Sequence, residues 1–287
     1  MGILLGMLAA CSAPPVKEAA PVVRAPKIAL VLGGGAARGF AHVGVIKVLE
    51  SHGIVPDMVV GTSAGSVVGA LYAGGYGGYD LQKIALQLDQ DSVGDFALPD
   101  RGFIKGELLQ DFINRALRNR PIEKLPKTFC AVATDLRNGE LMAFQRGNTG
   151  MAVRASSSVP GVFQPVKIGG REYVDGGLVS PVPVSVARKM GADIVIAVDI
   201  AAKPARASVG STVDILLQTF AVMMQGLSRY ELEQADVVIR PKVGGVGAAE
   251  FEQKNLAIME GEKAALAALP LIQSRLRRWA DQGGAPR

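Results

Sequence analysis

Short aliphatic runs that end in glycine turns recur along this sequence and limit the folds open to it. Such runs, separated by segments with a helical spacing of apolar residues, are typical of a parallel sheet covered by helices on both faces. The expected strands lie within residues 27–34, 57–62, 129–136, 140–147, 192–200 and 235–243. The expected helices are Ala36–Ser51, Ala64–Ala73, Lys105–Asn119, Pro183–Lys189, Ser211–Glu233 and Glu252–Arg278. We therefore predict an α/β fold, a three-layer α/β/α sandwich with a mostly parallel sheet.

The composition agrees with a buried aliphatic core. Hydrophobic residues make up 49% of the chain and aromatic residues only 5%, as buried parallel strands require. The net charge of +5 comes from cations scattered among acidic residues. Because there is no basic stripe with interleaved aromatics, we expect no nucleic-acid partner. No spacing of His, Cys and Asp indicates a metal site, and we expect no cofactor.

The stretch LGGGAARGFAHVGV, Leu32–Val45, joins a glycine turn to the start of a helix. Unpaired N–H groups and the positive end of the helix dipole suit such a turn to a negative oxygen. A dinucleotide site is one interpretation, because Gly33, Gly35 and Gly39 follow a strand. Asp57, the candidate ribose ligand, precedes the next apolar run instead of ending it, which disfavours that interpretation. A packing turn without a ligand is the other alternative.

Residues 61–65, GTSAG, fit the G-x-S-x-G pattern between an expected strand and an expected helix. This is the context of a nucleophile elbow, in which the serine lies at the apex of a strained turn. Gly61 and Gly65 would keep the strand and the helix from colliding. The same pattern also arises by chance in turns that only need small residues. We predict that Ser63 is a nucleophile.

A serine nucleophile needs a base, and the chain contains only two histidines. His42 lies on an apolar helical face, which favours a packed histidine over a catalytic one. His52 precedes Gly53 at the expected end of the same helix, where a terminal role fits. Neither histidine follows Ser63 in the chain order of α/β-hydrolase triads. A Ser-His-Asp triad is therefore disfavoured.

Asp175 offers a different base. It precedes Gly176 and Gly177 at the end of the strand-like run REYV. In isolation the Asp-Gly pair favours a hairpin turn. Taken with Ser63 and the glycine loop, Asp175 becomes the candidate base of a Ser-Asp dyad. Since a free carboxylate has a pKa near 4, burial would have to raise the pKa of this one.

The three motifs together resemble the patatin-like phospholipases, in particular the bacterial branch related to neuropathy-target-esterase domains. The resemblance runs from Lys27 to about Ile272. It includes the further stretches RGFIKGELL at 101–109, ATDLRNGE at 133–140 and RASSSVPGVFQPV at 154–166, and the ending ADVVIRP…IMEGEKAA. Such agreement in order is far more specific than any one motif.

The resemblance implies a lipid acyl hydrolase of phospholipase A or lysophospholipase type, with a phospholipid or lysophospholipid substrate. Ser63 would be the nucleophile and Asp175 the base. The N–H groups of Gly34, Gly35 and Ala36 would bind the oxyanion, supported by the motif residues Gly33, Arg38, Gly39, Gly61, Gly65, Gly176 and Gly177. Where the family shows G-x-G-x-x-G, this chain has Gly34 to Gly39 with alanine at position 36. The hole survives that change if the φ angle of Ala36 is negative.

Two other classes of function stay open. A nicotinamide-dependent oxidoreductase built on the Gly33 loop would bind a dinucleotide and would leave Ser63 and Asp175 unexplained. A non-catalytic envelope lipoprotein would keep the scaffold for binding alone, against which the intact Ser63, Gly65 and Asp175 argue. The sequence does not specify the head group, the acyl chain or the oligomeric state.

The first residues resemble a bacterial lipoprotein signal. The apolar run Ile3–Ala10 is too short to span a bilayer, and it leads into the sequence LAAC, which ends at Cys11. We expect a signal peptide over 1–10, an acylated Cys11 with a Pro/Ala-rich tether over 11–26, and the patatin-like domain over 27–287. The basic start of a signal peptide is missing, which indicates a true start upstream of Met1. The alternative is an apolar terminus with an incidental cysteine.

This interpretation of Cys11 predicts a lipid anchor that holds the protein to the bacterial envelope, in the outer membrane facing the periplasm. Cys130 lies in a strand-like run, so we expect a buried thiol and no disulfide.

Two other features have structural interpretations. In the expected helix Ser211–Glu233 the spacing favours a core stripe, although its methionines could line an acyl channel; the stripe is Leu216, Leu217, Phe220, Met223, Met224 and Leu227. Ser156, Ser157 and Ser158 lack an elbow and are expected to form a loop.

Overall fold

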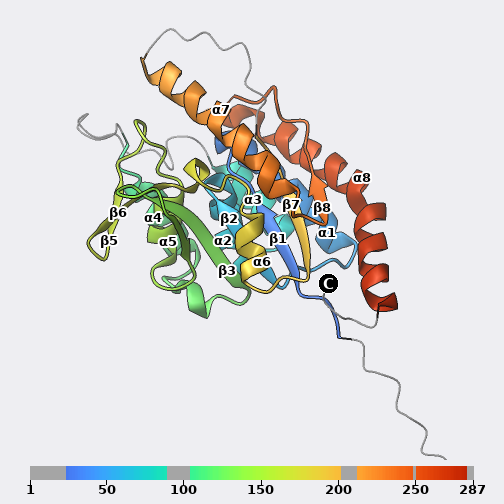
Figure 1. Ribbon diagram of the computed structural model, residues 1–287. Helices are drawn as coiled ribbons and strands as arrows, with labels where there is room; N and C mark the ends of the chain where they lie inside the picture. The colour runs from blue at the N-terminus through green and yellow to red at the C-terminus, as the bar shows by residue number, and fades with distance from the viewer. Residues whose placement is uncertain (1–23, 89–103, 202–211, 248–249, 283–287) are drawn as a thin grey trace, which may run out of the picture.

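A central sheet of eight strands organises the computed structural model, which describes residues 24–88, 104–201, 212–247 and 250–282 (Figure 1). Its strands are β1 Ile28–Leu32, β2 Met58–Thr62, β3 Thr128–Asp135, β4 Leu141–Phe144, β5 Val166–Ile168, β6 Arg171–Asp175, β7 Ile194–Val198 and β8 Val237–Ile239. The order across the sheet is β5-β6-β3-β2-β1-β7-β8, with β4 also paired to β3. The strands β3, β2, β1, β7 and β8 are parallel, whereas β4, β5 and β6 form antiparallel pairs.

Helices cover both faces of this sheet (Figure 1). They are α1 Phe40–Ser51, α2 Ala64–Ala73, α3 Gly78–Gln87, α4 Glu107–Ala116, α5 Thr149–Ser156, α6 Val184–Lys189, α7 Thr212–Leu232 and α8 Lys254–Asp281, with short 3₁₀ turns η1 Ala36–Gly39, η2 Ile122–Lys124, η3 Gly176–Leu178 and η4 Phe251–Gln253. The predicted three-layer α/β/α sandwich with a mostly parallel sheet is confirmed.

The alternation of side chains along β1 explains why both faces are covered. Leu30 and Leu32 join the core beneath α1, α2 and α8, whereas Ala29 and Val31 join the core on the other face, beneath α6 and the end of α7. Successive residues of a strand point to opposite faces, so a strand that is apolar at every position needs a cover on both sides. All five residues of β1, β2 and β7 are buried.

Several elements differ from the sequence prediction. The segment after β1 starts as a 3₁₀ turn, and α1 begins only at Phe40. The helices α3 and α5 were not expected, although Asn148 gives a readable start signal for α5, because its side chain accepts the N–H of Met151 at 2.7 Å. The predicted signal peptide, Cys11 and tether residues 11–23 lie outside the described residues. The buried thiol of Cys130 is confirmed.

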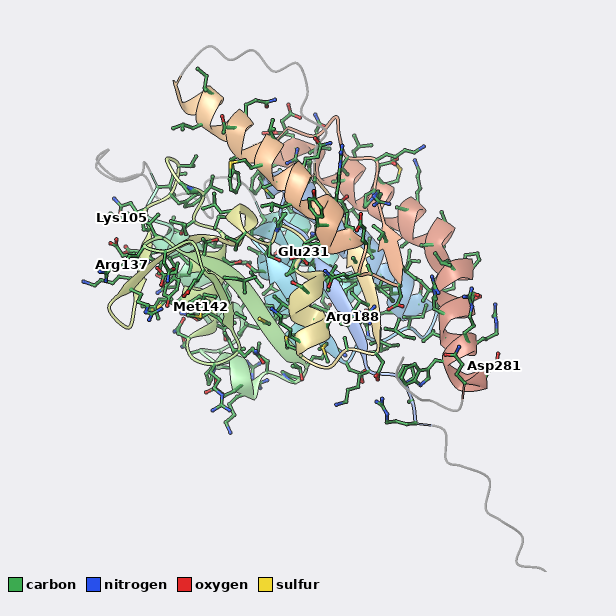
Figure 2. The ribbon with its side chains drawn as sticks, viewed as in Figure 1. Lys105, Arg137, Met142, Arg188, Glu231 and Asp281 are labelled. Atoms are coloured by element: carbon green, nitrogen blue, oxygen red, sulfur yellow. The ribbon has the colours of Figure 1, made fainter. Side chains whose placement is uncertain are left out.

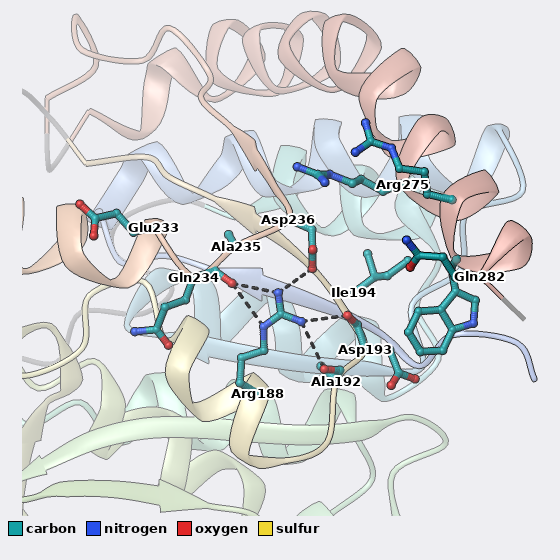
Figure 3. A pocket seen from close by; sticks show the side chains of 12 residues that line it. Arg188, Ala192, Asp193, Ile194, Glu233, Gln234, Ala235, Asp236, Arg275 and Gln282 are labelled. Atoms are coloured by element: carbon teal, nitrogen blue, oxygen red, sulfur yellow. Dashed lines mark hydrogen bonds and ion pairs between the residues drawn. The ribbon is translucent and has the colours of Figure 1, made fainter. Parts of the chain in front are cut away.

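Charged residues tie the chain together at the amino ends of the strands. Arg24 pairs with Asp193 at 2.8 Å, and its carbonyl accepts the indole N–H of Trp279 from α8 at 2.8 Å. A cleft of about 530 Å³ opens beside them (Figure 3). In it the Arg188 guanidinium binds Asp236 at 2.6 Å as well as three backbone carbonyls. This edge of the sheet is therefore a structural clasp between the first and last described segments.

Candidate active site

Ser63 lies at a sharp turn between the carboxyl end of β2 and the start of α2. Its backbone has φ 53° and ψ −124°, a left-handed conformation that non-glycine residues rarely adopt. A conformation of this kind costs roughly 1–3 kcal/mol and persists only where the surrounding structure enforces it. The turn thus has the strained geometry expected of a nucleophile elbow.

Gly61 and Gly65 are the residues that let this turn close. A Cβ on Gly65 would lie 2.0 Å from the carbonyl oxygen of Leu32, and one on Gly61 would lie 2.4 Å from the carbonyl oxygen of Gly65. Both contacts are with backbone, which cannot rotate away. The strand-to-helix turn therefore packs directly on the end of β1.

Gly65→Ala should destabilise the protein by about 3 kcal/mol, since the added methyl group forces α2 away from β1. The measurement is thermal or denaturant unfolding followed by circular dichroism. Gly226→Ala is the matched control, because no described residue lies within 4 Å of a Cβ at that position in α7. A Gly65→Ala protein as stable as the control would contradict the close packing of the elbow.

Serine hydroxyl groups form hydrogen bonds with the backbone of Ser63. Its N–H donates to the Ser156 hydroxyl oxygen at 2.9 Å, and that hydroxyl donates to the Val132 carbonyl at 2.6 Å. The Ser66 hydroxyl donates to the Ser63 carbonyl at 2.7 Å. The expectation that Ser156 forms a loop is wrong: it ends α5, is fully buried, and binds the elbow to β3.

Asp175 ends β6 beside Ala133 of β3 and is fully buried. Its N–H donates to the Ser158 carbonyl at 2.9 Å, and its Oδ1 accepts the Gly177 N–H at 2.7 Å. Its Oδ2 is buried and accepts no hydrogen bond from the residues that the structure describes. One carboxylate oxygen is therefore fixed by the backbone and the other is available to a proton.

The Asp-Gly pair is not a hairpin turn. The hairpin that contains Asp175 turns earlier, at Gly169 and Gly170, which have φ angles of 56° and 81° and join β5 to β6. At Gly176 a Cβ would lie 2.2 Å from the Val132 carbonyl oxygen, so the chain after Asp175 passes close to β3. The interpretation of Asp175 as part of a hairpin turn is thereby excluded.

Burial raises the pKa of the Asp175 carboxyl group from its ordinary value to about 6. The Ser63 hydroxyl and the Gly177 N–H act in the opposite direction, since both favour the ionised carboxylate. The structure thus brings Ser63, which follows β2, close to Asp175, which ends β6, although the two are far apart in sequence. A carboxylate with this pKa is a stronger base than a free one and is still largely ionised at neutral pH.

The glycine loop lies directly beside this pair. A Cβ on Gly34 would be 3.2 Å from the Cβ of Ser63. However, the N–H of Gly33 donates to the Val198 carbonyl and that of Gly34 to the Pro181 carbonyl, each at 3.0 Å. The prediction that Gly34 donates to an oxyanion is therefore corrected, because its N–H is already used.

Of the three amides predicted for the oxyanion, those of Gly35 and Ala36 stay candidates. Ala36 has φ 51°, so the condition of a negative angle is not met; its N–H stays a candidate because it donates to no carbonyl of the described residues. A left-handed alanine is strained, and glycine is the residue that this position would normally favour. Arg38 supports the loop from behind, because its Nε donates to the Gly35 carbonyl at 3.1 Å.

The two histidines have structural roles and lie apart from the Ser63–Asp175 pair in function, since each ring binds a backbone carbonyl. His42 is fully buried, and burial lowers its pKa to about 4, so the ring is neutral and its Nε2 binds the Gly33 carbonyl at 2.8 Å. His52 ends α1, where its Nδ1 contacts the Val48 carbonyl. Asp57 accepts the N–H of Ile28 at 2.7 Å, at the amino end of the strands. A ribose ligand would be needed at the carboxyl ends, so the geometry does not favour a dinucleotide site.

Met224 on α7 also contacts the site. The sequence analysis favoured a core position for this residue and gave an acyl channel as the alternative. Its Cε lies 3.3 Å from the position of a Cβ on Gly34, and its Sδ lies 3.1 Å from that of a Cβ on Gly177. Among the described residues there is no group of His, Cys, Asp and Glu that could hold a metal ion. The arrangement can therefore supply a nucleophile, a base, free amides and an apolar cover.

Comparison with known proteins places this site in a family. Residues 30–188 match the model of the patatin-like phospholipases. An uncharacterized NTE family protein of Mycobacterium tuberculosis is 32% identical over 272 residues, which cover 84% of this chain and 46% of the relative. Patatin-like phospholipase domain-containing protein 6 of Mus musculus is 35% identical over 189 residues, 63% of this chain and 14% of the relative.

Among solved structures, VipD from Legionella pneumophila is similar in fold, with a TM-score of 0.57 at 15% identity, over 86% of this chain and 67% of VipD. The chain spans about half the length of the first bacterial relatives that it matches. The family model covers more than half of the chain, including Ser63 and Asp175. The chain therefore belongs to the patatin-like phospholipase family.

Proposed function

We propose that this chain is a lipid acyl hydrolase, a carboxylic ester hydrolase of phospholipase A or lysophospholipase type. The observation that carries the proposal is a strained serine whose hydroxyl interacts with a buried aspartate, Asp175, which is held in place by the Gly177 N–H. Membership of the patatin-like phospholipase family supports a lipid ester as substrate. The apolar Met224 beside the pair suits an acyl chain.

In the first half of the reaction, the Ser63 oxygen attacks the ester carbonyl carbon while its proton passes to Asp175 Oδ2. The carbonyl oxygen becomes an oxyanion that the N–H groups of Gly35 and Ala36 stabilise. When the tetrahedral intermediate collapses, the C–O bond to the alcohol breaks and the leaving oxygen takes the proton from Asp175. The products are an alcohol, such as a lysophospholipid, and an acyl group on Ser63.

In the second half, Asp175 accepts a proton from water, and the water oxygen attacks the acyl carbon. The intermediate collapses to release the fatty acid, and the proton returns to the Ser63 oxygen. No group beyond the two side chains and the loop amides is needed for this sequence. His42 takes no part in it, because its ring is neutral and directed to the glycine loop.

A fluorophosphonate probe tests the proposal against a non-catalytic scaffold that only binds lipid. The wild-type chain should be labelled covalently at Ser63, as peptide mapping by mass spectrometry would show, and should hydrolyse both a soluble short-chain ester and a phospholipid. Denatured protein is the control for chemical labelling. A folded chain that takes no label and hydrolyses neither ester would refute the enzymatic function.

A further inference from the structure

The outward face of α7 carries an apolar stripe that none of the described segments covers. Ile215, Leu216, Val222 and Met223 are each between 49% and 52% exposed, and Tyr230 is 73% exposed. Their spacing places them along one side of the helix, over about 22 Å at 1.5 Å per residue. The sequence prediction of a core stripe is wrong for this side, because Leu216 and Met223 of the predicted stripe are exposed, whereas Met224 is buried.

The opposite side of α7 is held firmly to the body of the protein. Near its C-terminal end Glu231 (labelled in Figure 2) accepts the Ser180 hydroxyl at 2.6 Å and the Ser185 N–H at 2.9 Å. Leu232 is buried in the core next to α6. In Figure 1 the N-terminal end of α7 projects beyond the neighbouring elements. The stripe is therefore an exposed apolar surface on a helix whose other side is packed against the protein.

We propose that this stripe docks α7 on a phospholipid bilayer. The inference rests on the proposed function and identifies the physical form in which the lipid substrate is reached. Residues 215–228 contain no Asp, Glu, Lys or Arg, so the surface suits the uncharged acyl region of a bilayer. Tyr230, at one end of the stripe, is a residue type enriched at the boundary between acyl chains and head groups.

Two adjacent residues of α7 connect the stripe with the candidate active site. Met223 faces outward, whereas the next residue, Met224, packs against Gly34 and Gly177 beside Ser63 and Asp175. A helix lying in the interface would therefore hold the catalytic pair within a helix diameter of the lipid. No described helix is long and apolar enough to cross a membrane.

The test compares two matched pairs of substitutions in the full chain carrying Cys11→Ala, so that no acyl anchor contributes. Ile215→Gln with Met223→Gln alters the stripe, and Leu266→Gln with Leu271→Gln alters exposed leucines of α8 with similar exposure. Glutamine has a good helix propensity, so both helices should persist. Binding is measured by flotation with phosphatidylcholine vesicles, in the Ser63→Ala background to prevent hydrolysis.

The α7 pair should lose binding by roughly tenfold or more, since two apolar side chains no longer enter the bilayer, whereas the α8 pair should bind like the parent. With Ser63 intact, the α7 pair should hydrolyse vesicle phospholipid more slowly and a soluble short-chain ester at the parent rate. Equal vesicle binding by both pairs would overturn the docking surface. So would a substitution effect confined to oligomeric state, which would assign the stripe to a second copy of the chain.

A second measurement covers the case in which the α7 pair is poorly folded. An environment-sensitive fluorophore attached to Met223→Cys in the Cys11→Ala chain should shift to the blue on adding vesicles; the remaining thiol, Cys130, is buried. No shift would contradict the proposal. A wild-type chain that binds vesicles yet hydrolyses no ester at all would refute the proposed function and leave the docking surface standing.

Discussion

Ser63→Ala is expected to reduce ester hydrolysis by roughly 10⁴-fold or more, because the covalent acyl intermediate can no longer form. The same change should leave the unfolding temperature nearly unaltered. Alanine keeps the backbone strain of the turn, and the main-chain bonds of residue 63 to Ser156 and Ser66 do not involve the lost hydroxyl. Activity on a soluble ester and thermal unfolding, measured on the same preparation, check both parts.

Ser51→Ala is the matched control for this variant, since that hydroxyl lies at the end of α1 and binds only local groups. It should be fully active and fully labelled by the fluorophosphonate. If the Ser63→Ala protein were folded and still labelled, at Ser157 for instance, the nucleophile would have to be reassigned.

Asp175→Asn is expected to lower the rate by roughly 10²–10⁴-fold, the range typical for loss of a general base. It should also stabilise the fold at pH 8. The native state raises the pKa of this carboxyl group to about 6, so it disfavours the ionised form, and the penalty is complete above pH 6 and absent below the ordinary carboxyl pKa. A difference of two pKa units corresponds to about 3 kcal/mol, an upper limit on the gain in stability.

The pH dependence of kcat/KM tests independently whether Asp175 is the general base. Because the base must be ionised, kcat/KM should be level above pH 7 and fall about tenfold per unit below pH 6. His42→Gln should retain that acid limb, although it disturbs a hydrogen bond to the glycine loop. An acid limb that disappears in His42→Gln, together with loss of activity, would restore a histidine as the base.

The sequence could predict the parts of the site that local pattern determines. Gly61 and Gly65 mark a turn between a strand and a helix, and a buried β-branched run has few alternatives to a parallel strand. Asp175 could be found because the chain offers no suitable histidine. These inferences need only spacing and residue type, and the structure brings the predicted residues together.

Other parts depend on contacts between distant segments and could not be predicted. The N–H of Gly34 is used by Pro181, and the hydroxyl of Ser156 reaches the elbow across β3. Neither partner is near in sequence. Likewise the apolar spacing of α7 shows that the helix has an apolar side, but the spacing does not say whether protein or something else covers that side.

The clasp at Arg24 gives the molecule a direction. The described chain enters at the amino ends of the strands, where Arg24 is tied to Asp193 and Trp279, whereas Ser63 lies beyond their carboxyl ends. Anything joined to the chain before Arg24 would therefore be attached at the amino ends of the strands. Whether that attachment is a lipid, a linker or a further domain, it would leave the elbow and the N-terminal end of α7 at the opposite end of the domain.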